Sequence, residues 1–269
     1  MGSAQLGRRL PPERAFYGIS ALVFASSTAV TIAWCASMSR MADMPMPGGW
    51  TMSMAWMRSS GQTWASAAVS FLGMWLVMMV AMMLPSLIPM LRRYREAASA
   101  TDSTRLGPLT ALVGVAYFSM WTLFGVAVFP LGIALAIVEM REPALSHAVP
   151  VAVGVVVLLA GALQFTEWKA RHLACCREAP ALHRTLRSDA ATAWRHGLAL
   201  GVHCIKCCAG LMAVLLVIGV MDLRTMTVVS AAITVERLAP AGERVARGIG
   251  ALGIAYGFFL IIHGVGVVG

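Results

Sequence analysis

The sequence predicts an all-α membrane protein, a polytopic bundle of about seven transmembrane helices that forms a single domain over residues 1–269. Of its 269 residues, 59% are hydrophobic and only 12% are charged, whereas an ordinary soluble domain has about 25% charged residues. The mean hydropathy is +0.76. A soluble fold of this size could not bury so much apolar surface behind so few charges. No polar stretch is long enough for a second domain, which excludes a two-domain soluble enzyme.

Seven apolar segments approach or exceed the roughly 20 residues that a membrane-spanning helix needs. The first is longer than the apolar core of a signal peptide, about 7–15 residues, so we expect an uncleaved span. The sixth is the shortest, which leaves six spans as the alternative count. The segments lie at 16–37, 62–91, 109–137, 148–168, 197–221, 222–237 and 248–268.

The distribution of basic residues predicts the orientation of the chain. Of 21 Lys and Arg residues, sixteen lie in loops on one side, four lie on the other, and Lys206 lies inside a span. Cytoplasmic loops contain the excess of Lys and Arg. We therefore expect a cytoplasmic N-terminal tail at 1–15, a basic cytoplasmic loop at 169–196, an outer methionine-rich loop at 38–61 and an outer C-terminus. This bias also explains the net charge of +9 without a nucleic-acid partner.

A cluster of cysteines near the start of the fifth span is the most informative motif. Cys204, Cys207 and Cys208 lie at i, i+3 and i+4, so a helix would place them on one face, next to His203. Soft thiolate ligands select Cu(I), Zn or iron–sulfur clusters. Lys206 would favour the thiolate form of a neighbouring cysteine, or else extend to the membrane surface. The alternative for the cysteines is simple packing, since a free Cys behaves as a small hydrophobe.

A second cluster follows the fourth span. His172, Cys175 and Cys176 have the spacing of metal ligands, but one such half-site is a weak signal. Both clusters belong to the connection 169–196 and its flanks. We therefore expect them to face each other at the cytoplasmic mouth of the bundle and to form a metal or redox site.

Methionines form two helical stripes in the second span, and Met78, Met82 and Met83 are the candidate thioether ligands. Thioethers coordinate Cu(I) well and Zn poorly. Counted inward at 1.5 Å per residue, Met78 and Met82 reach the same depth as the cysteines of the fifth span. The alternative is a core filled by flexible Met side chains. Pro85 and Pro89 should kink this span, because membrane helices tolerate proline.

Methionine is also concentrated in the outer loop 38–61, where Met41, Met44 and Met46 are the candidate residues of a Cu(I)-collecting segment. Packing does not explain methionines that are exposed to water, so their concentration in this loop favours a ligand role. The alternative is a loop that lies against lipid, with Trp50 and Trp56 as aromatic residues of the membrane interface.

Small residues recur at helical spacing in two spans. The pair Gly197 and Gly201 forms a GxxxG motif, and four glycines from Gly250 to Gly264 recur in the last span. Such faces allow helices to approach closely. They predict close packing within the bundle and also permit a homo-oligomer.

Three segments together resemble a bacterial family described as predicted metal-binding integral membrane proteins. They run from Met74 to Pro85, from Gln164 to Pro180 and from Gly201 to Met221. The resemblance covers roughly residues 60–260. It implies a multi-pass inner-membrane protein with a metal site and no known reaction. The chain departs from the family pattern at Lys206, where the family tends to have Gly, and at His172, where it tends to have Cys.

The leading functional hypothesis is a Cu(I)-binding membrane protein that transports copper or delivers it to a partner protein. One alternative is a thiol–disulfide membrane oxidoreductase that uses Cys204 with Cys207 and Cys175 with Cys176. Another is a non-catalytic scaffold subunit. A haem protein with paired histidines is the weakest of the alternatives. No HExxH, G-x-S-x-G or P-loop motif is present, so a hydrolase or ATP-driven pump is not expected.

Overall fold

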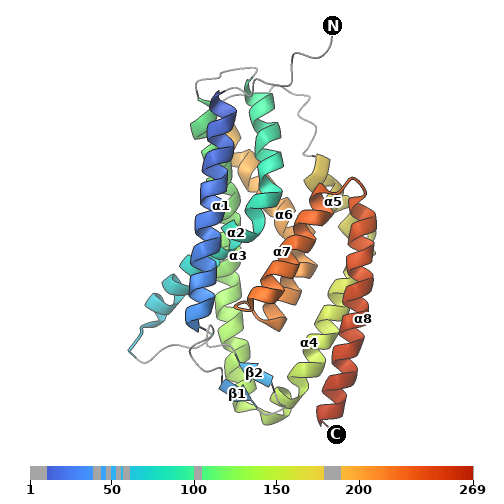
Figure 1. The fold of residues 1–269 in the computed structure, drawn as a ribbon. Helices are drawn as coiled ribbons and strands as arrows, with labels where there is room; N and C mark the ends of the chain where they lie inside the picture. Colours follow the sequence, from blue (N-terminus) through green and yellow to red (C-terminus); the bar gives the residue numbers. More distant parts are fainter. Residues whose placement is uncertain are drawn as a thin grey trace.

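The structure, a computed structural model, describes residues 11–38, 44–46, 50–52, 56, 61–99, 105–178 and 189–268. Within these residues it forms eight helices and a small two-stranded hairpin (Figure 1). Six of the helices, α1, α2, α3, α4, α6 and α8, are long and apolar enough to cross a membrane, which confirms the predicted helical class. The elements are α1 (Pro11–Met38), β1 (Met44–Met46), β2 (Trp50–Met52), α2 (Trp64–Ser99), α3 (Leu106–Arg141), α4 (Pro143–Leu163), α5 (Glu167–Glu178), α6 (Ala190–Ile218), α7 (Leu223–Leu238) and α8 (Gly242–Val268).

The predicted sixth span is helix α7, and its length distinguishes it from the others. It has 16 residues, about 24 Å at 1.5 Å per residue, which is less than the roughly 30 Å of a hydrocarbon core. The chain reverses before α7 at Gly219, which has a φ of 150°. Asp222 then caps α7 by accepting hydrogen bonds from the backbone N–H groups of Arg224 and Thr225. As a result, α1 begins and α8 ends at opposite ends of the bundle (Figure 1).

The predicted basic loop at 169–196 is mostly helical in its described part. Helix α5 covers Glu167–Glu178, and α6 begins at Ala190. The Asp189 side chain caps α6 by accepting a 2.6 Å hydrogen bond from the Thr192 backbone N–H. Helix α5 is too short and too polar to span, and it packs against α6, α7 and α8.

The glycine-rich faces pack as the sequence predicts. Helices α4 and α8 lie along each other, and a Cβ atom on Gly161 would lie 2.7 Å from the backbone N of Ile254. Likewise, a Cβ on Gly257 would lie 2.6 Å from the backbone N of Leu158. The GxxxG face of α6 packs on α3, where a Cβ on Gly201 would lie 2.8 Å from the Met120 Cβ. Only glycine allows these backbones to approach so closely.

Helix α2 changes direction along its length (Figure 1), and both Pro85 and Pro89 lie inside it. Proline removes a backbone hydrogen bond and kinks a helix. Near the bend, Ser230 of α7 donates a 3.2 Å hydrogen bond to the Met82 carbonyl oxygen. The Ser86 hydroxyl donates to the Met83 carbonyl oxygen at 3.0 Å. The Ser230 bond joins α2 and α7 where the methionine stripes lie, and the Ser86 bond lies within α2.

The hairpin of β1 and β2 lies over the turn between α3 and α4. The Trp50 indole donates a 2.9 Å hydrogen bond to the Ser146 carbonyl oxygen. Met46 packs with Ala136, Trp50 and Trp56 in a small second cluster, and Trp56 also packs against the main core. The described part of the methionine-rich loop is therefore folded against the bundle.

Candidate metal centre

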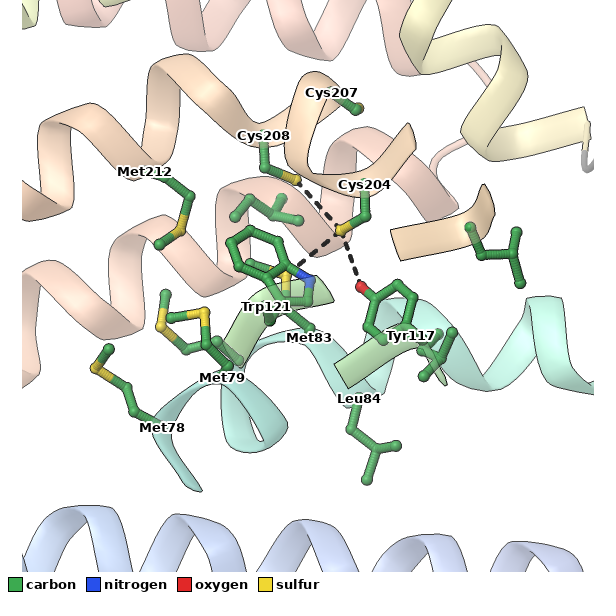
Figure 2. Packing of buried hydrophobic residues seen from close by; sticks show 14 of the residues in the cluster. Met78, Met79, Met83, Leu84, Tyr117, Trp121, Cys204, Cys207, Cys208 and Met212 are labelled. Carbon is green, nitrogen blue, oxygen red and sulfur yellow. Dashed lines mark hydrogen bonds between the residues drawn. The ribbon is translucent and has the colours of Figure 1, made fainter. Parts of the chain in front are cut away.

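Cys204 lies at the centre of a buried group of sulfur atoms (Figure 2). Its Sγ atom is 4.0 Å from the Cys208 Sγ and 4.0 Å from the Met83 Sδ. The Tyr117 hydroxyl donates a 2.8 Å hydrogen bond to the same Cys204 Sγ. All four side chains are at most 1% exposed. Two thiols and a thioether thus meet in a dry environment.

Three elements bring this group together. Cys204 and Cys208 are i and i+4 on α6, so their side chains lie one above the other. The bent helix α2 provides Met83. Helix α3 provides Tyr117, and it comes close enough because Gly201, one turn before Cys204, lies directly against α3.

Arg237 of α7 is the cation that reaches the thiols. Its Nη2 lies 3.3 Å from the Cys208 Sγ and 3.8 Å from the Cys176 Sγ. Its Nη1 donates a 3.1 Å hydrogen bond to the Ser86 hydroxyl. The side chain is only 6% exposed. Within the described part of the chain, no carboxylate pairs with this guanidinium.

A buried ion pair adjoins the sulfur group. The Lys169 Nζ lies 2.7 Å from Glu236 Oε2 and donates a 2.8 Å hydrogen bond to the Cys207 carbonyl oxygen. Gln164 donates a 2.7 Å hydrogen bond to Glu236 Oε1. All three polar side chains are buried. This pair is neutral in sum and ties α4, α5, α6 and α7 together at the cysteines.

Cys176 and Cys207 form a second, adjoining contact between α5 and α6. Both are buried, and their thiols interact with each other. The Cys176 thiol also donates a 3.4 Å hydrogen bond to the His203 carbonyl oxygen. The two cysteine clusters of the sequence therefore do meet, through Cys176 rather than Cys175, which is exposed.

Several predicted residues lie apart from the thiols. The His172 ring packs on Trp168, with its Nδ1 2.7 Å from the Trp168 carbonyl oxygen. The His203 Nδ1 is buried and, among the described residues, has no hydrogen-bond partner. Lys206 is exposed on α6. The position beside the thiols that the sequence suggested for Lys206 is filled by Arg237.

The predicted methionines divide into three groups. Met83 contacts Cys204, while Met78 and Met82 are buried in the same core cluster. Figure 2 shows Met78, Met79 and Met212 on the side of the site opposite Tyr117. Of the loop residues, Met46 packs in the small second cluster. Met44 pairs with Met52 through the strand backbone, and Met41 lies outside the described residues.

The sequence predicts that Cys204, Cys207 and Cys208 share one face of a helix, but their thiols do not form one three-thiol group in the structure. Among the described residues, no three His, Cys, Asp or Glu side chains converge on one point. Cys204 pairs with Cys208, Cys207 interacts with both Cys176 and Cys208, and the third sulfur beside Cys204 belongs to Met83. A candidate site here combines two thiols and one thioether.

Sequence reasoning missed Tyr117, Ser86 and Arg237. A single Tyr or Ser in an apolar run gives no signal of its own. Arg237 was counted among the loop cations because it ends the short apolar segment 222–237. Arg237 directly follows Glu236 in a largely apolar segment, and this position is the sequence signal that could have indicated a buried charge.

The fold and the site define a class: a helical bundle in which six helices are long and apolar enough to cross a membrane, with a buried thiol–thioether cluster at its centre. Residues 72–260 match the PpoB2 family, described as copper chaperones, and the chain belongs to this family. The metal-related family expected from the sequence is thereby confirmed in its broad sense. No curated protein and no solved structure matches the chain.

The matched residues cover the sulfur group and its neighbours, including Met83, Tyr117, Cys176, Cys204 and Arg237. They begin after the methionine-rich loop 38–61. The family match thus concerns the buried site and says nothing about the outer loop.

Proposed function

We propose that the protein binds Cu(I) between Cys204, Cys208 and Met83 and hands the ion to, or receives it from, a partner. The observation that supports this most directly is the spacing of the sulfur atoms. An ion bound to three sulfurs in a plane at about 2.3 Å requires sulfur–sulfur separations of about 4 Å. Both separations measured from Cys204 are 4.0 Å. Thiolates and thioethers together favour Cu(I) over Zn, in agreement with the name of the family.

The buried methionines of α2 supply a route by which the ion could move through ligand exchange. Met78, Met79 and Met82 are each at most 4% exposed and belong to the same core cluster as Cys204. A soft ion passed from one thioether to the next does not need to be hydrated. We propose that Met41, Met44 and Met46 collect the ion at the outer end of this route.

The proposed setting is the bacterial inner membrane, with a cytoplasmic N-terminus. The six span-capable helices and the excess of basic residues on one side of the predicted topology support it. In this setting the partners are the lipid bilayer, the copper ion as cargo, and a protein that donates or accepts copper.

Burial argues against the thiol–disulfide alternative. Exchange with another protein requires an accessible thiolate. Cys204, Cys207 and Cys208 are each at most 2% exposed, and Cys176 is equally buried. Cys175 is exposed, but its neighbour is not. No observation specifically favours a scaffold role.

The test is a competition titration of detergent-purified protein with a Cu(I) chelator. The double variant Cys204→Ser with Cys208→Ser should lose tight copper binding, because hydroxyls are poor ligands for a soft ion. Cys175→Ser is the matched control and should bind as the wild type does. Met41→Leu with Met44→Leu should change only the rate of loading. A double cysteine variant with wild-type copper stoichiometry would refute the site.

A further inference from the structure

We infer that Arg237 fixes the charge of the ion that the centre accepts, and that it selects a monovalent ion over a divalent one. This inference rests on the proposed Cu(I) site and goes beyond it. It assigns selectivity to a residue that binds no metal, through the charge it places beside the thiols.

Arg237 is the unbalanced charge of the described core. A guanidinium remains protonated in proteins, and burying an isolated charge is costly. Ionisable residues buried at membrane depth therefore have functional partners by default. The partners of Arg237 are Ser86 and the thiols of Cys176 and Cys208. Its Nε is buried and has no hydrogen-bond partner among the described residues. The negative charge that balances Arg237 must therefore come from the sulfur group.

The other buried charges cancel and do not affect this balance. Lys169 and Glu236 form a closed pair with their N and O atoms 2.7 Å apart. Lys206 is exposed and approaches none of the thiols through a described hydrogen bond. The net charge of the centre is therefore the sum of the charges of Arg237, the thiolates and the bound ion.

Two thiolates and a monovalent ion make a group of charge −1, which Arg237 neutralises. Two thiolates and a divalent ion make a neutral group, which leaves Arg237 uncompensated in a dry environment. A divalent ion would need a third thiolate to restore the balance. The structure does not offer one beside Cys204, because the third sulfur there is the neutral thioether of Met83. The other thiol near Arg237, that of Cys176, donates its proton in a hydrogen bond to the His203 carbonyl oxygen and is therefore counted as neutral. Within the described residues, no third Cys, His or carboxylate converges there.

The experiment compares two soft ions of different charge, Cu(I) and Cd(II), titrated separately into detergent-purified protein against chelators of known affinity. The neutral variants Arg237→Met and Arg237→Gln should lose at least about tenfold of the preference for Cu(I), since breaking a buried charge pair has effects of this size or larger. Their Cd(II) affinity should rise, because a neutral thiolate–Cd(II) group no longer faces a cation. Arg237→Gln retains hydrogen-bond donors, so it separates charge from hydrogen bonding.

Two further variants complete the design. Arg237→Lys retains the positive charge and should retain the wild-type preference. Lys206→Met removes a positive charge from the same helix as the thiols, but at an exposed site, and should behave as the wild type. Thermal unfolding of each metal-free variant establishes that it is folded. If one neutral variant does not fold, the other provides the comparison.

The outcomes distinguish this inference from the proposed function. A wild-type protein that binds no Cu(I) contradicts the proposed function. A wild-type protein that binds Cu(I), together with neutral variants that keep the same ratio of Cu(I) to Cd(II) affinity, overturns the role of Arg237 alone. An equal decrease in Cu(I) and Cd(II) affinity in Arg237→Met and Arg237→Gln would also overturn the inference. Such a result would show that Arg237 supports the structure of the site but does not select the charge of the bound ion.

Discussion

Met83 is the one residue of the proposed centre whose contribution is purely that of a ligand atom. Cys204 and Cys208 also receive hydrogen bonds or charge contacts from Tyr117 and Arg237. The Met83 side chain is fully buried and touches the site through its Sδ. Leucine has nearly the same volume as methionine, so the thioether can be removed with little change in packing.

We predict that Met83→Leu weakens Cu(I) binding by at least about tenfold, the smallest loss seen even for residues that only support a metal ligand. The free energy of unfolding of the metal-free protein should change by less than about 1.5 kcal/mol. Chelator competition and thermal unfolding measure the two quantities. Met90→Leu, a buried methionine on the same helix, is the control and should leave copper binding unchanged. Equal binding by both variants would exclude Met83 as a ligand.

At this scale the sequence predicts which sulfur atoms lie close together better than it predicts their surroundings. The contact of Cys204 with Cys208 follows from helical spacing, and the similar depth of Met78, Met82 and the cysteines follows from counting residues inward. Tyr117 and Arg237 could not be found in this way, because they reach the site from other helices. Their positions depend on the glycine contact between α3 and α6 and on the hairpin of α6 and α7, which are tertiary features.

Among the elements, the pair α4 and α8 shows most clearly how composition determines packing. Both helices consist largely of apolar residues, and lipid solvates apolar side chains as well as protein does. Their association therefore depends on close backbone approach at glycines such as Gly161 and Gly257. Since Gln164 and α5 follow directly after α4, this contact also positions the buried ion pair next to Cys207.

Gly161→Ala should destabilise the protein by about 1–3 kcal/mol, because the new Cβ would overlap the backbone of α8. Gly114→Ala is the control on α3, where an added Cβ meets nothing within 4 Å. There the loss of backbone freedom in the unfolded state should stabilise the helix by about 0.5–1 kcal/mol. The midpoints of thermal unfolding in detergent should shift in opposite directions. A shift in the same direction would mean that the α4–α8 contact is not tight.

Helix positions were predictable where apolar runs are long, and less so where the chain is mixed. The runs at 62–91 and 109–137 became α2 and α3, because about 20 apolar residues leave few alternatives to a helix. Helix α5 was missed because its charged residues resemble a loop in a hydropathy pattern. Helix α7 was found, but its 16 residues could not decide between six and seven crossings.

For the molecule as a whole, the number of membrane crossings depends on helix α7. Six helices satisfy the length criterion, and an even number would return the C-terminus to the side of the N-terminus. The structure places the start of α1 and the end of α8 at opposite ends (Figure 1). Helix α7, which connects α6 to α8, is shorter than the six helices that meet the span criterion.

We predict that a reporter fused after Gly269 is read as outside the cytoplasm and that one inserted near Ser188 is read as cytoplasmic. The physical reason is the excess of Lys and Arg on the side of the 169–196 connection. An enzymatic reporter active on only one side of the membrane gives the measurement in cells. A cytoplasmic reading after Gly269 would mean that α7 does not carry the chain across and that the protein has six spans.

The adjacency of Glu236 and Arg237 on α7 has a mechanical consequence. Consecutive residues of a helix point about 100° apart, so these two side chains project in different directions from one rigid rod. Glu236 forms an ion pair with Lys169 of α5. Arg237 contacts the thiol of Cys176 on α5 and the thiol of Cys208 on α6. Helix α7 cannot turn about its axis to withdraw the guanidinium without also pulling the carboxylate from its amine. Any rotation of α7 that exposed the sulfur atoms would therefore break both the ion pair and the guanidinium contacts.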